Sequence, residues 1–348
     1  MMKRIEVQSA GLTDAGLVRV DNQDQFFVAD LTRGLLVQAG SLDAAKKSRL
    51  FGGPMGHLFF VADGMGGHRA GSEASMLAIK YFVNAILNSP RWLLQVPPSS
   101  EANFVDDLKG ILLDAHKSIQ KQSASDPQYE GMGTTFTMVY VVWPKMFVVH
   151  AGDTRCYVMR AGELRLITND HTVANQMMRA GRLDPQSIER SPWSNVLVNA
   201  LGAGANEVFA EMHTLDLLLG DTLLLCSDGL NKHVTDYQIR QNLLAFMDPD
   251  MACDKLIQNA KQGGGSDNIT VVVARFTEPR LQGGRMKIMA SHSSDEYVLQ
   301  DIEIPESDLD TSVETDGSVA SQSFGDTKET AEFRPQIDTS TGEFFEPK

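Results

Sequence analysis

Apolar positions in the first 277 residues follow two different spacings. Short apolar or alternating runs recur between turn-forming residues, whereas longer stretches repeat apolar residues every three to four positions, as amphipathic helices do. The predicted strands are Asp24–Asp30, His57–Ala62, Thr134–Val142, Lys145–His150, Cys156–Arg160, Val208–Leu215, Thr222–Cys226 and Ile269–Phe276. The predicted helices are Gly71–Asn88, Ala102–Ser123, Val173–Ala180, Asp236–Phe246 and Met251–Lys261. Because strands come in consecutive runs with helices inserted between them, the pattern favours an α+β layered domain over a doubly wound sheet.

Three segments lack either spacing. Leu31–Gly56 has mixed polarity and several glycines near its end, and we interpret it as an insertion loop. Gly181–Ala205 contains two prolines and no clear period, which is typical of a mobile surface segment. After Phe276 the pattern decays into acidic and Ser/Thr-rich sequence, the composition of a disordered tail. The predicted organisation is therefore a folded domain at 1–277 and an acidic tail at 278–348.

The charge supports this division and argues against nucleic-acid binding. The 348 residues are 42% apolar and 22% charged, a globular balance, with a formal net charge of −14. From Glu278 to Lys348 there are 16 acidic and 6 basic residues, so most of the net charge lies in the tail. A nucleic-acid protein would carry a basic face instead.

Several other classes are excluded by missing sequence features. No apolar run approaches the roughly 18 to 20 residues that span a bilayer, and the start MMKRIEVQSAG has no apolar core of a signal peptide. Three cysteines cannot form a disulfide framework, so we expect a cytoplasmic protein without a membrane partner. No cysteine begins a C-x5-R loop of a thiol phosphatase, and a G-x-x-x-x-G-K-[ST] phosphate loop is absent.

Three aspartates occupy the same kind of position, at an end of an apolar strand. Asp63 follows one predicted strand, Asp228 follows another, and Asp267 precedes a third. Carboxylates projecting from strand ends into one crevice can converge on hard divalent cations, and the glycines after Asp63 and Asp228 let a backbone carbonyl come close. A lone Asp-Gly pair is more often a simple turn, so position alone leaves both readings open.

Eight motifs along the chain decide between a metal site and simple turns. They are GLVRVDNQD at 16–24, FFVADGMGGHRAGSEAS at 59–75, GMGTTFTMVYV at 131–141, HAGDTRCYVMRAGEL at 150–164, TNDHT at 168–172, NVLVNALGA at 195–203, LLLCSDGL at 223–230 and GSDNITVVV at 265–273. Together they resemble the metal-dependent type 2C Ser/Thr protein phosphatases, the PPM family, in a bacterial style. The resemblance runs from about Gly11 to Phe276.

The resemblance implies a fold and a metal centre. The expected fold is a central antiparallel β-sandwich flanked by helices on both faces, with two Mn²⁺ or Mg²⁺ ions in a cleft at one end. Asp63 should bridge both ions, with the carbonyl of Gly64 on one of them and Asp228 and Asp267 on the other. Asp153 resembles the residue that helps Asp228 to bind a third, weaker ion.

The resemblance also implies residues for the phosphate and the leaving group. Arg19 matches the arginine that holds the substrate phosphate, and a guanidinium can hold two phosphate oxygens at once. His68 matches the histidine proposed as general acid, although a surface histidine in a Gly-rich turn is the simpler alternative. Many relatives have Glu-Asp where this chain has Gln23-Asp24. We therefore expect Asp24 to act on a metal through bound water, with weaker affinity at one metal position.

The expected function is hydrolysis of phosphoserine and phosphothreonine in proteins by a metal-activated water. A regulatory protein that keeps the fold without catalysis is the main alternative, and the presence of all three metal aspartates argues against it. A partner-switching phosphatase with one small target domain is a further alternative. We expect a monomer acting on phosphoproteins, among them a Ser/Thr kinase or its targets, with Gly181–Ala205 influencing substrate choice. The acidic tail is either a solubilising segment or a docking segment.

Overall fold

The computed structural model describes residues 5–36, 49–66, 69–88, 101–188, 191–203, 207–279 and 296–298. The chain divides into two compact units, Met1–Gln300 and Asp301–Lys348, and the second lies wholly outside the described residues. The described residues therefore all belong to the first unit.

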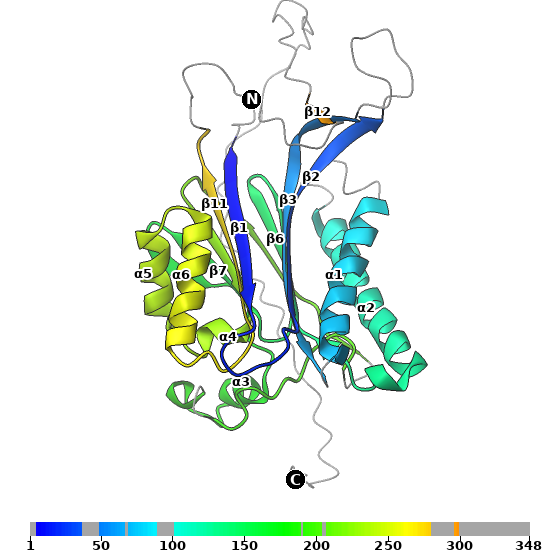
Figure 1. Cartoon of the computed structure of the whole chain (residues 1–348), viewed down its shortest axis with the longest axis vertical. Helices are drawn as coiled ribbons and strands as arrows, with labels where there is room; N and C mark the ends of the chain where they lie inside the picture. Colours follow the sequence, from blue (N-terminus) through cyan, green and yellow to red (C-terminus); the bar gives the residue numbers. More distant parts are fainter. Residues whose placement is uncertain are drawn as a thin grey trace, which may run out of the picture. The chain divides into compact units, whose positions relative to one another are not determined.

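Two β-sheets form the centre of the first unit (Figure 1). The first sheet has the order β1 (Glu6–Asp14), β11 (Ile269–Thr277), β10 (Thr222–Cys226), β7 (Arg155–Arg160) and β8 (Glu163–Leu166). The second has the order β12 (Glu296–Val298), β3 (Arg49–Met65), β5 (Phe136–Val142), β6 (Lys145–Ala151) and β9 (Glu211–Asp216), with β2 (Asp24–Leu36) and β4 (Gly133–Thr134) also paired to β3. Neighbouring strands are antiparallel except β12, which is parallel to β3.

Helices cover the outer faces of both sheets, which gives four layers (Figure 1). On one side lie α1 (Arg69–Asn88) and α2 (Glu101–Ser125), and on the other α5 (Asp236–Ala245) and α6 (Pro249–Gln262). Two shorter helices, α3 (Val173–Arg179) and α4 (Asp228–Asn231), lie at one end of the sandwich together with 3₁₀ turns at Pro127–Tyr129 and Pro185–Ser187. None of the helices in these ranges is both long and apolar enough to cross a membrane.

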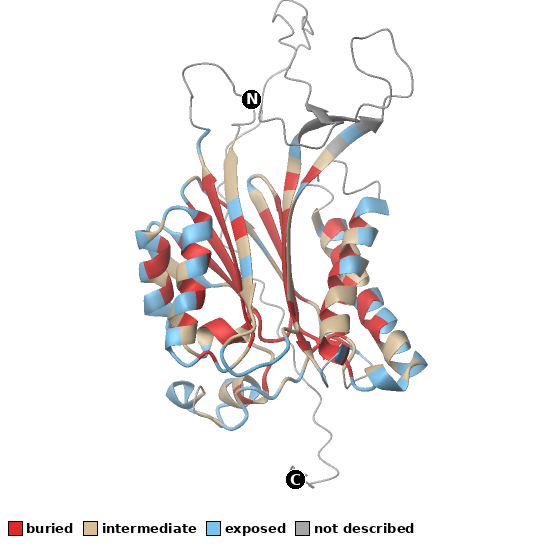
Figure 2. Cartoon of the chain, viewed as in Figure 1, coloured by how far each residue is buried: buried red, intermediate tan, exposed pale blue. Residues whose placement is uncertain are grey.

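The two-residue period of the strands builds a core on each side of each sheet. On β3, Phe59 and Val61 pack between the two sheets, whereas Phe60 and Ala62 face α1 and α2. The helices turn one apolar stripe inward, visible as the buried residues on their sheet-facing sides in Figure 2. The fold is therefore the α+β sandwich with helices on both faces that the motifs predicted.

The prediction of a loop at Leu31–Gly56 is wrong at both ends. β2 continues to Leu36 and β3 begins at Arg49, and these ends pair with each other in antiparallel register. Backbone hydrogen bonds hold such a hairpin without any alternation of apolar side chains, which is why the mixed polarity resembled a loop. Residues 37–48 lie outside the described part of the chain.

Two strands at the edges of the first sheet were not predicted. β1 and β8 lie at the two edges of their sheet and carry few buried side chains, so they gave no strand signal.

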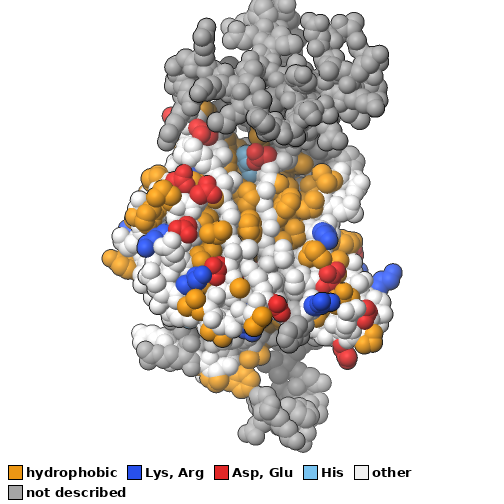
Figure 3. Space-filling model, viewed as in Figure 1, with side chains coloured by type: hydrophobic (Ala, Val, Ile, Leu, Met, Phe, Trp, Pro, Cys, Tyr) orange, Lys and Arg blue, Asp and Glu red, His pale blue; other side chains and the backbone are white. Residues whose placement is uncertain are grey.

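Figure 3 shows apolar side chains visible along the open side of the sandwich, between the two helical layers, with Lys and Arg scattered among acidic side chains. Of the predicted tail 278–348, Glu296–Val298 forms β12 against Arg49–Phe51, and residues 280–295 and 299–348 lie outside the described residues.

The three cysteines are all buried in the sandwich. Cys156 lies between the sheets, whereas Cys226 at the end of β10 and Cys253 on α6 lie in the core between the first sheet and its helices. Burial raises the pKa of each thiol above its ordinary value. These side chains therefore act as small apolar core residues, as the sequence predicted for Cys226.

Candidate active site

A cavity of about 1230 Å³ opens at the end of the sandwich where the β1–β2 loop and α4 lie (Figure 1). It is lined by six of the eight residues that the sequence predicted for the site: Arg19, Asp63, Gly64, Asp153, Asp228 and Asp267. A seventh, Asp24, is buried next to the cavity without lining it. The eighth, His68, lies outside the described residues, so its predicted role as general acid stays a prediction.

Asp24 and Asp63 face each other across the β2–β3 pair. Asp24 is 2% exposed, and its Oδ2 accepts hydrogen bonds from the hydroxyls of Ser227 and Thr270, each at 2.7 Å. These two hydroxyls come from the other sheet, so Asp24 joins the two sheets beneath the cavity. Asp63 forms part of the cavity wall above it, with its backbone N–H bonded to the hydroxyl of Thr135 at 3.0 Å.

Asp153 is carried by a tight turn between β6 and β7. Gly152 has φ +120°, a conformation that other residues rarely adopt, and a Cβ there would lie 2.5 Å from the Cβ of Thr135. A glycine at this position therefore lets the turn pack against the start of β5 and places Asp153 in the cavity wall. Asp153 is 7% exposed.

Two cations balance the charge at the other side of the cavity. Lys232 Nζ lies 2.5 Å from Asp228 Oδ2 and 2.9 Å from Asp267 Oδ2. Arg19 contacts Asp267 through two nitrogens, with Nε 2.8 Å from Oδ1 and Nη2 3.1 Å from Oδ2. The Arg19 side chain is 57% exposed at the cavity mouth, so its planar fork is accessible from solvent.

Burial, together with mutual repulsion, raises the pKa of four of the five site aspartates. Burial, reinforced by repulsion from neighbouring aspartates, holds the pKa of Asp63 and Asp153 well above its usual range. The pKa of Asp228 is also raised by burial, and that of Asp24 rises to about 6. Asp267 differs, because hydrogen bonds and charge from Lys232 and Arg19 outweigh its burial and lower its pKa. The site therefore concentrates negative charge beyond what its own cations neutralise.

The metal-free protein should be more stable at pH 5 than at pH 7. The folded chain binds protons at Asp24, Asp63, Asp153 and Asp228 more tightly than the unfolded chain, whose carboxylates titrate near 3.8. Stability from this source is therefore lost as pH rises through about 6. His150, whose burial lowers its pKa to about 4, acts in the opposite sense, but it is one group against four.

Melting temperatures of EDTA-treated protein at pH 5 and pH 7 measure this effect. We expect a higher value at pH 5, and we expect Mn²⁺ to remove or reverse the difference because it neutralises the carboxylates at pH 7. Asp63→Asn should flatten the dependence in EDTA. A higher melting temperature at pH 7 without metal would contradict the prediction.

Gln23 and Gly64 support the cavity floor through their backbones. The carbonyl of Gln23 accepts hydrogen bonds from Gly64 N–H at 3.2 Å and from the hydroxyl of Ser75 at 2.7 Å. The Gln23 side chain donates to the carbonyl of Gly66 at 3.4 Å and adds no charge to the site. A Cβ on Gly64 would lie 2.2 Å from the carbonyl oxygen of Gly71 in the first turn of α1. Only glycine at position 64 therefore lets β3 pass this close to the helix.

Sequence reasoning missed three functional neighbours. Lys232 stands four residues after Asp228, a spacing that brings charged side chains together on a helix and could have identified the pair. Ser227 and Thr270 hold Asp24 from the other sheet, and no local pattern reveals such a contact.

Comparison with known proteins places this arrangement in a family. A profile of the Protein phosphatase 2C family matches residues 43–257. The chain belongs to the protein phosphatase 2C family. Among its type 2C relatives, the Ser/Thr phosphatase stp of Listeria monocytogenes is 31% identical over 216 residues, covering 62% of this chain and 83% of the relative.

Another type 2C relative is longer. The Ser/Thr protein phosphatase PstP of Mycobacterium tuberculosis is 33% identical over 283 residues, or 79% of this chain and 47% of PstP. The chain therefore matches about half the length of that relative. A crystal structure of the M. tuberculosis phosphatase PstP/Ppp has a TM-score of 0.63 at 30% identity, covering 79% of this chain and all of that one. A PstP catalytic domain in complex with two manganese ions has a TM-score of 0.61 at 30% identity, with the same coverage.

Proposed function

We propose that this type 2C protein hydrolyses phosphoserine and phosphothreonine in other proteins, with two Mn²⁺ or Mg²⁺ ions. One observation carries the proposal: aspartates from separate elements of both sheets converge with Arg19 on one cavity. The relatives named as Ser/Thr phosphatases and the manganese-bound PstP domain support it.

The donor set of the cavity fits hard divalent cations. Its negatively charged groups are carboxylates, the ligands such ions prefer. Two buried oxygens, Asp24 Oδ1 and Asp228 Oδ1, have no hydrogen-bond partner within the described residues. Bound ions would lower the pKa of a water and offset the charge of the phosphate. The residues proposed to hold the two ions are Asp63, the carbonyl of Gly64, Asp228 and Asp267, with Asp24 beneath them. Asp153 and Asp228 would hold a third, weaker ion.

The remaining polar residues would position the substrate and its proton. Arg19, at the cavity mouth, would exchange its two contacts with Asp267 for two phosphate oxygens. Lys232 stays on the carboxylates, where its charge and hydrogen bonds lower the pKa of Asp267 and oppose the rise in the pKa of Asp228 that burial causes. His68 is proposed to protonate the departing serine or threonine oxygen.

Water is the proposed nucleophile because the hydroxyls bonded to the site aspartates, and the three thiols, are otherwise committed. Ser227 is fully buried and its hydroxyl donates to Asp24 at 2.7 Å. Thr135 is 2% exposed and its hydroxyl accepts from the backbone of Asp63. The three cysteines lie in the core and do not line the cavity.

The rim of the cavity suits a peptide with apolar residues beside the phosphorylated one. Val18 and Val20 flank Arg19 and are 66% and 94% exposed. Val196 and Val198 line the same cavity from the segment 191–203 and are also exposed. Exposed apolar side chains gathered around one charged cavity mark a binding site, and each methylene buried there contributes about 0.8 kcal/mol. This supports the predicted influence of Gly181–Ala205 on substrate choice.

Phosphate release from synthetic phosphothreonine peptides tests the proposal. We expect turnover with Mn²⁺, none after EDTA treatment, and recovery when Mn²⁺ is restored, since the carboxylates alone repel the phosphate. Peptides with Val or Leu beside the phosphothreonine should have a lower KM than peptides with Asp there. Metal-independent turnover, or none under any of these conditions, would refute the proposed chemistry. A Ser/Thr kinase or its targets are the proposed natural substrates.

A further inference from the structure

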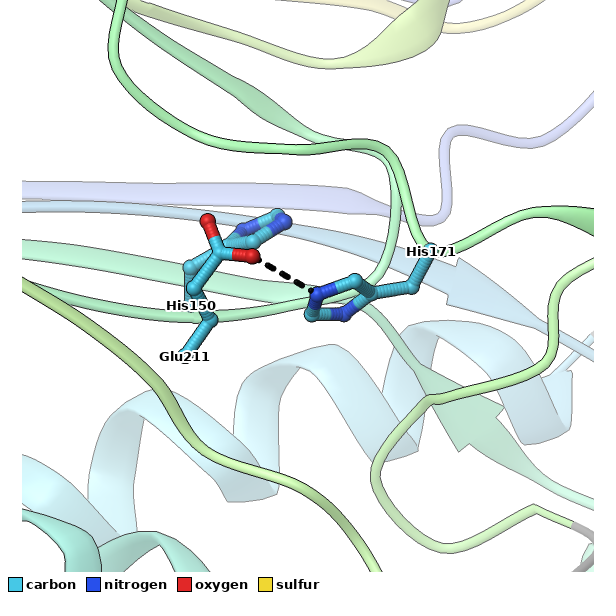
Figure 4. Close-up of side chains that lie close together, drawn as sticks. All are labelled: His150, His171 and Glu211. Atoms are coloured by element: carbon cyan, nitrogen blue, oxygen red, sulfur yellow. Dashed lines mark hydrogen bonds and ion pairs between the residues drawn. The ribbon is translucent and has the colours of Figure 1, made fainter. Parts of the chain in front are cut away.

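A buried cluster of two histidines and a glutamate lies behind the cavity wall. His150 on β6, His171 just before α3 and Glu211 at the start of β9 place one ligand-type atom each within 4.8 Å of the others (Figure 4). The two imidazole rings are 4.8 Å apart between centroids. These residue types can bind a transition metal, or they can form a hydrogen-bonded support, and the partners of each nitrogen distinguish the two.

The partners of His171 fix which of its nitrogens carries the proton. Its Nδ1 receives the backbone N–H of Gly152 at 3.1 Å, and a backbone N–H can only donate. The side-chain nitrogen of Asn199 also lies 2.8 Å from Nδ1, oriented by the Asn199 oxygen, which accepts the N–H of Phe209. Nδ1 is therefore an acceptor, and Nε2 carries the proton that is donated to Glu211 Oε2 at 3.0 Å. A neutral His171 then has no free lone pair for a metal.

The rest of the cluster is equally committed. His150 Nε2 faces the carbonyl of Asn169 at 3.0 Å, so it also carries a proton, while Nδ1 pairs with the hydroxyl of Thr137 at 2.8 Å. Glu211 accepts four hydrogen bonds: from the backbone and side chain of Asn169, from His213 and from His171. Its carboxylate is thus held in one orientation and selects the tautomer of His171.

His171 joins two parts of the cavity wall that are distant in sequence. Its backbone N–H donates to the carbonyl of Gly152 at 2.7 Å while its ring accepts from the N–H of the same residue, so two bonds hold the turn that carries Asp153. Its backbone carbonyl accepts from Val198 N–H at 2.9 Å, and its ring contacts Asn199. Both of these residues line the cavity rim.

We propose that His171 is a positioning residue whose Nδ1 fixes the Gly152–Asp153 turn, and with it the Asp153 carboxylate, while Glu211 holds the imidazole in the required tautomer. The inference rests on the proposed function in one respect, that Asp153 contributes to cation binding. It assigns a role to the TNDHT motif, for which the sequence alone indicated none.

Two substitutions separate the two nitrogens of His171. The oxygen of His171→Asn can occupy the place of Nδ1 and accept from Gly152, whereas the amide of His171→Gln can replace only the Nε2 donor to Glu211. Mn²⁺ binding to the full-length protein is measured directly, from the electron paramagnetic resonance signal of free Mn²⁺, together with the Mn²⁺ dependence of p-nitrophenyl phosphate hydrolysis. We expect His171→Gln to weaken the weakest Mn²⁺ position about tenfold and His171→Asn to stay within threefold of wild type.

Melting temperatures and a second variant control for folding. Glu211→Gln keeps the His171 imidazole but no longer fixes its tautomer, so it should weaken Mn²⁺ binding by a smaller factor than His171→Gln. This variant tests the inference if His171→Gln does not fold. Equal weakening in both His171 variants, or no weakening in either, would overturn the inference alone. If wild type retains a bound transition metal that both His171 variants lack, the cluster is a metal site and the inference is also overturned. A wild type that binds no Mn²⁺ would overturn the proposed function as well.

Discussion

Replacing Asp63 by asparagine should lower Mn²⁺-dependent phosphatase activity by about 10³-fold or more. Asp63 stands in the cavity wall opposite Asp24 and is the carboxylate expected to contact both ions. Its loss removes charge stabilisation worth several kcal/mol in the transition state, and each 1.36 kcal/mol is a factor of ten in rate. Initial rates with p-nitrophenyl phosphate and with a phosphothreonine peptide measure the effect.

The same substitution should stabilise the protein when no metal is present. Asp63 is repelled by Asp24, Asp228, Asp153 and Asp267, so a neutral amide of the same size relieves a cost of folding. We therefore expect a higher melting temperature than wild type in EDTA and a smaller increase on adding Mn²⁺. A loss of activity together with a gain in metal-free stability would identify Asp63 as a functional carboxylate, because loss of a structural carboxylate would lower both.

Asp30→Asn is the matched control for Asp63→Asn. Asp30 lies on the same β2–β3 pair, opposite His57 and away from the cavity, with an exposed side chain. Its substitution should leave activity within twofold of wild type. Activity above a tenth of wild type in Asp63→Asn would contradict the assignment of this carboxylate.

Replacing Arg19 by lysine should lower kcat/KM by roughly 10- to 100-fold. A planar guanidinium contacts two oxygens at once, as Arg19 does with Asp267, whereas an ammonium acts as a single point of charge. Hydrogen bonds to charged groups contribute roughly 1.5 to 3 kcal/mol, which corresponds to this range. Inhibition by inorganic phosphate should weaken in parallel, because phosphate would use the same fork.

Arg160→Lys controls for the loss of an arginine–aspartate pair. Arg160 makes the same two-nitrogen contact with Asp221, at 2.9 and 2.7 Å, without lining the cavity. Activity should be unchanged in this variant even if the melting temperature falls. If phosphate inhibits Arg19→Lys as strongly as wild type, Arg19 does not hold the phosphate.

The sequence predicted the site better than it predicted the edges of the fold. The aspartates and Arg19 stand in distinctive motifs, and six of the eight predicted residues line one cavity. By contrast, β1 and the outer ends of β2 and β3 are held by backbone pairing, which leaves little trace in side-chain pattern. Such pairing depends on partners distant in sequence, and periodicity within one segment cannot reveal it.

The supporting contacts escaped prediction for a related reason. Ser227 and Thr270 are ordinary residues at strand ends until the two sheets pack and bring them to Asp24. His171 stood in a recognisable motif, but its task depends on Gly152 and Asn199, which approach it only in the folded chain. Residues proposed to contact the ions or the substrate stand in recognisable sequence motifs, whereas the residues that support them are identified only by their contacts in the folded chain.

The burial of all three cysteines has a consequence for oxidative stress. Peroxide attacks exposed thiolates, and here each thiol is buried with a raised pKa, while the proposed chemistry uses none of them. Thiol-dependent phosphatases lose their nucleophile to sulfenic acid under the same conditions. A phosphatase built on this sandwich would continue to remove phosphate through an oxidant pulse that silences such enzymes.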